Sequence, residues 1–365
     1  MLRDGKTLLD EKRYDEAQRA FARVLLQDRG RAAGYTGLGL SLLGAGREEE
    51  AFQALQKAIA LEPKQARALY GLATLYLKIS FPDEAIRRLQ SAVAADPGDA
   101  ECHFLLGVTL RDVGRSAAAE DSLKKAVSLK PSEGRYLANL AWVQAKANNT
   151  VDARKNFEAA ALASPKDSVV LGLYGSSLVD DVEKSRGEAD MKKAETLLQD
   201  AIQIDSNNYN ARYNLGNLYL IQNKSKEAVP HLESAIERYP GMATAWYRLG
   251  TAYAKLGNTD RSVYCRKQFQ QLSDYDLAKS TAEEQARTNL KDPALRLKLA
   301  RLYARGGEDT RALNQYAMYL SLKPNDTIVV KEQESFILSL KKQGNLPKMD
   351  TFNAMILSAG KSKTP

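Results

Sequence analysis

The sequence predicts an all-α protein built from stacked helix hairpins, and three regularities indicate it. Prolines recur every 34 residues, at Pro63, Pro97, Pro131 and Pro165. Glycine or alanine recurs at the eighth position of each 34-residue unit, and alanine recurs at the twentieth. A large apolar residue recurs at position 24. A sequence period of about 20–50 residues is typical of repeat arrays, in which each unit packs mainly on its neighbours.

The small residues explain how two helices of one unit can pack. A small side chain on each helix lets the two backbones approach closely, and the large residue at position 24 fills the space beside them. A proline ends the second helix because it cannot donate a backbone N–H and biases the preceding residue away from helix. Asp99, Asp167 and Asp326 then stand where the next helix needs an N-cap.

Two segments carry the pattern most clearly, Tyr213–Tyr219 (YNLGNLY) and Trp246–Tyr253 (WYRLGTAY). They resemble the first-helix signature of the tetratricopeptide repeat family. The resemblance covers roughly 300 residues and implies a right-handed α-solenoid of about nine helix-turn-helix units. In that family the first helices line a concave face, where partners bind.

The first eight units are assigned to residues 1–274. The first unit lacks its opening residues, because Gly5 already stands at position 8. This indicates a trimmed or mature chain, or a degenerate first repeat. The sixth unit exceeds the period by seven residues, and we expect the excess to form an acidic loop near residues 179–190, between its two helices.

The eighth unit departs most from the pattern. Ser262, Arg266 and Phe269 replace small and apolar residues, and the next proline of the series, Pro324, comes 16 residues late. The segment 280–283 reads STAE, which is typical of a helix start. We therefore expect an extra helix over residues 275–292 and a weak joint near 260–292. The ninth unit follows at 293–326, and residues 327–365 are expected to form capping helices, near 327–342 and 350–357, and a tail.

The residue types that catalysis or metal binding requires are scarce. The chain has two histidines and two cysteines, and no pair of them has the spacing of metal ligands. The glycines of Gly37–Gly39 and Gly360–Ser362 do not complete a dinucleotide or phosphate loop. We therefore expect no enzymatic activity, no cofactor and no metal. No apolar run approaches the roughly 18 residues that a membrane span needs.

A stripe of aromatic and polar residues is expected along the first helices, at positions 2, 5, 9, 12 and 13. Aromatic rings give contact area at low entropic cost, and arginine and asparagine reach peptide groups, so the stripe suits an extended peptide. The alternative, that these aromatic rings pack between repeats, stays open. The candidate partner-binding residues are Tyr70, Phe104, Arg111, Trp142, Tyr213, Asn214, Asn217, Tyr247 and Arg248.

Some members of the family hold the C-terminal carboxylate of chaperones with a clamp of five residues. Only Asn214 and Arg248 match that clamp here, and Gly172, Ser176 and Thr244 stand at the other three positions. The resemblance therefore does not favour a chaperone clamp.

The net charge of +8 lies entirely in residues 243–365, because basic and acidic residues are equally numerous in residues 1–242. Arg296, Lys298, Arg301 and Arg305 are expected to lie close together on one helix and to repel one another. They indicate either a solvated basic surface or a docking surface for an acidic partner. The acidic 179–190 segment of a second copy is one candidate, so self-association stays open.

The main hypothesis is a non-enzymatic scaffold that binds a protein or extended peptide on the concave face. One alternative is a regulatory or substrate-recruiting arm of a larger enzyme. Another is a nucleic-acid-binding array that uses the basic last third, which is the weaker option because no RNA- or DNA-reading motif accompanies the charge. The compartment is not readable; a cytoplasmic location is the default, and a periplasmic or secreted one follows if the N-terminus was trimmed.

Overall fold

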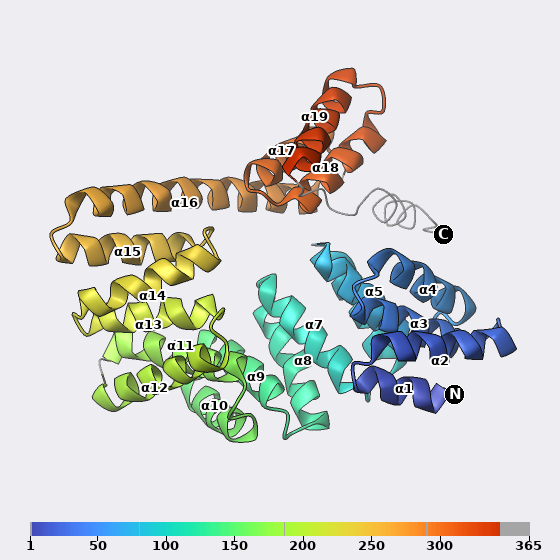
Figure 1. Ribbon diagram of the computed structural model, residues 1–365, viewed down its shortest axis with the longest axis horizontal. Helices are drawn as coiled ribbons and strands as arrows, with labels where there is room; N and C mark the ends of the chain where they lie inside the picture. Colours follow the sequence, from blue (N-terminus) through green and yellow to red (C-terminus); the bar gives the residue numbers. More distant parts are fainter. Residues whose placement is uncertain (1, 80, 186, 290, 344–365) are drawn as a thin grey trace. The chain divides into compact units, whose positions relative to one another are not determined.

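The computed structural model describes residues 2–79, 81–185, 187–289 and 291–343. Within these ranges the chain forms helices joined by short connections and no strand, so the expected all-α fold is confirmed (Figure 1). Among the described residues, no helix combines the length and the apolar character needed to cross a membrane.

The helices gather into two compact units. One unit contains the chain up to Gly98 together with the chain from Leu277, and the other is Asp99–Asp276. The first contains α1 (Leu2–Asp10), α2 (Tyr14–Gln27), α3 (Ala32–Gly44), α4 (Glu48–Leu61), α5 (Ala66–Lys78), α6 (Pro82–Ala95), α17 (Pro293–Arg305), α18 (Asp309–Leu322) and α19 (Thr327–Gln343). The second contains α7 (Ala100–Asp112), α8 (Ser116–Leu129), α9 (Gly134–Lys146), α10 (Thr150–Ala163), α11 (Ser168–Ser185), α12 (Glu188–Ile204), α13 (Tyr209–Ile221), α14 (Ser225–Arg238) and α15 (Ala243–Lys255). Helix α16 (Thr259–Thr288) begins in the second unit and ends in the first.

Consecutive helices pair as antiparallel hairpins, and the small residue at position 8 sets their distance. A Cβ placed on Gly107 would lie 2.6 Å from Leu123 Cγ, and one on Gly216 would lie 2.7 Å from Leu232 Cγ. The close neighbour is thus the large residue at position 24, with the carbonyl oxygen of the position-20 alanine, Ala119 or Ala228, next to it. These alanines are completely buried, which is consistent with the packing expected from the repeat pattern.

The expected N-caps are present. Asp99 accepts hydrogen bonds from the backbone N–H groups of Glu101 and Cys102 at the start of α7. Asp167 caps α11 in the same way, and Asp326 caps α19. Each aspartate satisfies N–H groups that have no partner inside the helix.

The excess of the sixth unit extends two helices and does not form the expected loop. Helix α11 has 18 residues where α9 and α13 have 13, and α12 has 17 where α10 has 14. Val182 in the added part and Val179 just before it are fully buried, which favours helix there. The acidic side chains find cations on neighbouring helices: Asp180 pairs with Lys146 at 2.7 Å, and Asp190 pairs with Arg154 at 2.7 Å.

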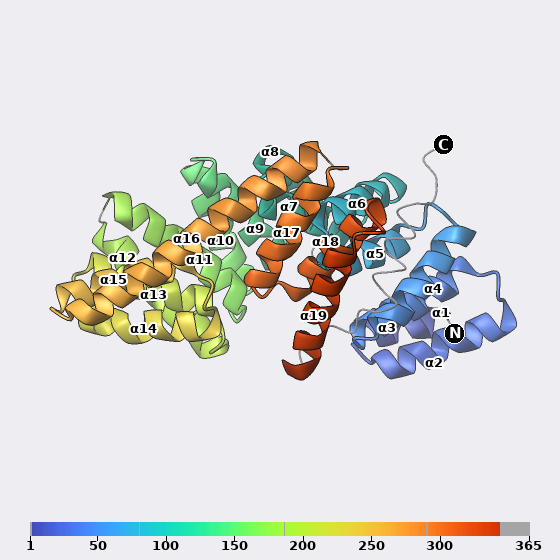
Figure 2. The ribbon, with the colours of Figure 1, turned by 90° about the horizontal axis from the view of Figure 1, so that it is seen from above.

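The extra helix expected over residues 275–292 is also not separate. Residues 259–288 form the single helix α16 (Figure 2). No proline or glycine interrupts this stretch of sequence. Ser280 and Thr281, which resemble a helix start, donate their hydroxyls to the carbonyl oxygen of Leu277 inside the helix.

The two halves of α16 contact different helices. Gly250 of α15 lies against Ser262 and Cys265 in the first half. Leu299 and Tyr303 of α17 pack with Ala282 and Ala286 in the second half. The capping helix expected near 327–342 is present as α19. The helix expected near 350–357 and the tail lie outside the described residues.

Candidate partner-binding surface

The first helices of the hairpins in the Asp99–Asp276 unit lie next to one another. Helix α9 contacts α11, α11 contacts α13, and α13 contacts α15. Positions 5, 6, 9 and 12 of these helices carry the predicted site residues, so the fold brings most of them into neighbouring rows. We call the surface that these positions form on α7, α9, α11, α13 and α15 the first-helix face. Tyr70 belongs to the other unit, and its ring lies 5.3 Å from the guanidinium of Arg67.

Phe104 packs between two repeats. Its ring stacks on that of Tyr136 of α9, with 4.5 Å between the ring centroids. For this residue the alternative left open by the sequence, packing between neighbouring repeats, describes what the structure shows. Phe104 therefore stabilises the α7–α9 contact.

Trp142 lies close to two cations. The guanidinium of Arg111 lies 5.2 Å from its ring centroid, and Lys146 Nζ lies 5.5 Å from it. Both distances are within the range of a cation–π contact. Arg111 also donates to Asn139 of α9 and pairs with Asp112 at 2.8 Å. The indole is half-buried and its orientation is set by these cations, which makes it a preformed platform at this end of the face.

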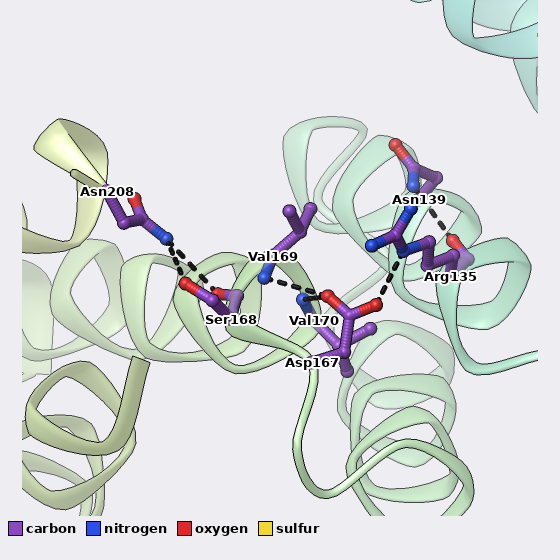
Figure 3. A network of polar contacts seen from close by, with 7 residues as sticks. All are labelled: Arg135, Asn139, Asp167, Ser168, Val169, Val170 and Asn208. Atoms are coloured by element: carbon purple, nitrogen blue, oxygen red, sulfur yellow. Dashed lines mark hydrogen bonds and ion pairs between the residues drawn. The ribbon is translucent and has the colours of Figure 1, made fainter. Parts of the chain in front are cut away.

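A polar network joins the starts of three first helices (Figure 3). Arg135 of α9 pairs with Asp167 at 2.5 Å, while the other oxygen of Asp167 caps α11. Asn208, which caps α13, donates to Ser168 Oγ at 2.8 Å and to the Ser168 carbonyl oxygen at 3.2 Å. Ser168 Oγ in turn donates to the carbonyl oxygen of Ala201. The network holds neighbouring hairpins in register, and only its Asp167 cap could be expected from the sequence.

Arg248 forms the other polar centre of the face. Its Nη2 lies 2.8 Å from Glu183 Oε1, although 65 residues separate the two. Burial lowers the pKa of Arg248, but its hydrogen bonds to Glu183 and the Tyr213 hydroxyl, with the charge of Glu183, outweigh this and raise the pKa. Arg248 on α15 is thus linked both to α13 and to the added turns of α11. The sequence offered no signal for the contact with Glu183.

Two asparagines on α13 are less available than the sequence suggested. Asn214 is buried and donates to the carbonyl oxygen of Asn210 in its own helix. Asn217 is 3% exposed, and its Oδ1 has no hydrogen-bond partner among the described residues. Tyr247 is the most exposed of the predicted aromatic residues in this unit, at 49%, and its ring centroid lies 5.3 Å from that of Phe269 in α16.

The four basic residues of α17 do not form the exposed cluster that the sequence predicts. Arg296 is only 6% exposed and donates to Gln315 Oε1 at 3.3 Å; burial lowers its pKa. It stands at position 4, which packs inside the hairpin. Arg301 makes two contacts with Glu332 of α19, at 2.8 and 2.7 Å, so its charge is matched within the fold. Lys298 and Arg305 are the two members of the cluster that lie exposed without such a contact in the described structure.

The family comparison agrees with this geometry. Tetratricopeptide repeat family models match residues 2–66, 42–108, 100–133 and 213–265, which together make about half of the chain. The chain belongs to the tetratricopeptide repeat family, whose fold typically mediates protein–protein interaction. No protein with a curated description matches the sequence.

Solved structures share the fold at low sequence identity. The Cut9–Hcn1 hetero-tetramer of APC/C matches with a TM-score of 0.59 and 17% identity, over 68% of this chain and 48% of that chain. The present chain thus spans about half of that relative. Human IFIT1, solved as a dimer with PPP-AAAA, matches with a TM-score of 0.56 and 15% identity, over 87% of this chain and 81% of that one. PilF of Pseudomonas aeruginosa matches with a TM-score of 0.50 and 22% identity, over 62% of this chain and 98% of that one.

Proposed function

We propose that the protein is a non-enzymatic scaffold that binds an extended segment of a partner protein along the first-helix face of the Asp99–Asp276 unit. The tetratricopeptide repeat fold supports a protein partner. The observation that carries the proposal is that partly exposed rings alternate with arginines along one face: Trp142 with Arg111, and Tyr213 and Tyr247 with Arg248.

The chemistry of this face suits an extended peptide. Tyrosine and tryptophan bury a large area with few rotatable bonds, so ordering them on binding costs little. Arginine and tyrosine hydroxyl groups can reach backbone carbonyls and acidic side chains of a segment laid across the helices. Between the two aromatic positions, α11 carries the partly exposed Ser176, whereas Gly172 is buried against Asn208.

The experiment begins with crosslinking of the full chain in extracts of its native source, followed by mass spectrometry of the captured proteins. Affinity for a captured partner is then compared between the wild type and a Tyr213→Ala/Tyr247→Ala double variant. Loss of these anchors should weaken binding by at least ~2 kcal/mol. Tyr239→Ala is the matched control, because Tyr239 is also 49% exposed but lies at the end of α14, off the first-helix face.

Two results would contradict the proposal. One is equal affinity in the wild type and the double variant while both keep their helical circular dichroism. The other is capture of RNA that survives in the double variant and disappears on ribonuclease treatment, which would favour the nucleic-acid alternative. The ribonuclease measurement is included because human IFIT1, which has a similar fold, was solved with PPP-AAAA.

A further inference from the structure

The added turns of α11 place a carboxylate on the first-helix face. Helix α11 has 18 residues where α13 and α15 have 13, and Glu183 lies in the added part. Its Oε1 lies 2.8 Å from Arg248 Nη2 of α15. Helix α13 contacts both α11 and α15, so this ion pair passes over a whole hairpin. The other ion pairs of the insertion join helices only one hairpin apart, with 34 or 36 residues between partners.

The exposure of this ion pair allows another carboxylate to replace that of Glu183. The side chain of Arg248 is 27% exposed and that of Glu183 is 45% exposed, so water and solutes reach both. Such solvent-accessible pairs contribute little to stability, and a competing carboxylate can replace one partner at little cost.

The following inference about this contact rests on the proposed scaffold function. We infer that Arg248 binds an acidic side chain of the partner segment. Glu183 occupies Arg248 when no partner is bound and competes with that side chain. The partner is therefore an acidic peptide segment, whose carboxylate replaces that of Glu183 on the Arg248 guanidinium. No bond is made or broken other than these ion pairs, and the released Glu183 carboxylate returns to water.

The test uses the full chain and a fluorescein-labelled hexaglutamate peptide, with hexaglutamine as the uncharged probe, followed by fluorescence anisotropy at low salt. Glu183→Gln should bind hexaglutamate about three- to tenfold more tightly than the wild type, because the competing ion pair is gone. Glu188→Gln is the matched control: it makes the same charge change in the same acidic segment, and Glu188 is exposed. It should bind like the wild type. Adding Arg248→Gln to Glu183→Gln should abolish the gain.

A second measurement tests the displacement directly. Saturating hexaglutamate should speed amide hydrogen exchange in residues 179–183 of the wild type, because the end of α11 loses its contact with α15. Equal affinities of Glu183→Gln and Glu188→Gln would overturn the inference, and so would failure of Glu183→Gln to bind the probe. If a captured partner still depends on Tyr213 and Tyr247 in that case, the scaffold function stands and only the role of Glu183 fails.

Discussion

Gly216 and Gly250 occupy the same position of neighbouring units but have different surroundings. A Cβ on Gly216 would lie 2.7 Å from Leu232 Cγ, which is too close for a real contact. At Gly250 the nearest atom is Cys265 Cβ at 3.2 Å, and Arg266, which stands where Leu232 does in the preceding unit, comes no closer than its Cγ at 3.7 Å. The same substitution should therefore have different consequences at the two sites.

Gly216→Ala should lower the free energy of unfolding by about 1–3 kcal/mol, the usual cost of overpacking a core. Gly250→Ala should change it by less than about 1 kcal/mol, because the helix propensity gained by alanine offsets a mild crowding. Urea unfolding followed by circular dichroism measures both. Equal destabilisation of the two variants would show that the spacing at position 8 does not control packing.

The residue type of Arg296 does not reveal whether its side chain is exposed or buried. Four basic residues on one helix suggested a charged surface, yet Arg296 packs inside its hairpin and Arg301 pairs with Glu332. Position 4 is also buried at Leu69, Leu137 and Leu171, so it is a packing position in several repeats. A long arginine can be accommodated there because its aliphatic stem packs while its guanidinium finds Gln315.

At the scale of elements, tyrosines on the first helices join three consecutive helices. The Tyr303 hydroxyl donates to Glu283 of the preceding helix at 2.7 Å, and Arg311 of the following helix lies 5.4 Å from its ring. Tyr253 makes the equivalent contacts with Glu233 and Arg261. Burial, followed by the hydrogen bond to Glu283, raises the pKa of Tyr303 far above its usual range, so its hydroxyl remains a donor.

Tyr303→Phe removes that donor and leaves the ring in place. The free energy of unfolding should fall by about 1–2 kcal/mol, because the partly buried Glu283 loses a hydrogen bond. Tyr35→Phe is the control: its ring lies 5.1 Å from Lys57 Nζ, and no hydrogen bond of its hydroxyl is seen in the described structure. Differential scanning calorimetry should show a lower transition temperature for Tyr303→Phe only. An unchanged transition would mean that ring packing alone joins these helices.

At the scale of the whole molecule, stability in a repeat protein is roughly a sum of local terms. Helix α16 is the element that runs from one compact unit into the other, and the boundary falls at Asp276/Leu277. None of residues 271–280 in its middle is buried, whereas Ser262 and Cys265 towards one end and Ala282 and Ala286 towards the other are. The weak joint that the sequence predicts near residues 260–292 stays a prediction.

Amide hydrogen exchange can test this joint. Residues 272–280 should exchange faster than those of α13 and α14, because their hydrogen bonds are protected by little tertiary packing. The expected difference in protection is at least about tenfold, which corresponds to ~1.4 kcal/mol of local opening free energy. Uniform protection from α13 through α16 would argue against a joint at this place.

The sequence by itself determined the all-α repeat architecture, the family and the N-caps at Asp99, Asp167 and Asp326. These features depend on local spacing, and helix starts, helix ends and small-residue contacts repeat with the 34-residue period. The row of candidate site residues on the first helices also follows from that spacing, since position in the unit decides which side of a helix a residue occupies.

Only the tertiary structure decided which of those residues are used for packing and which find partners. The stacking of Phe104 on Tyr136, the pairing of Arg301 with Glu332 and the contact of Glu183 with Arg248 join residues about 31–65 positions apart. The same holds for α16, in which residues 259–288 form one continuous helix where a separate extra helix was expected. Such outcomes depend on which helices lie side by side and at what distance, and a local pattern carries no information about either.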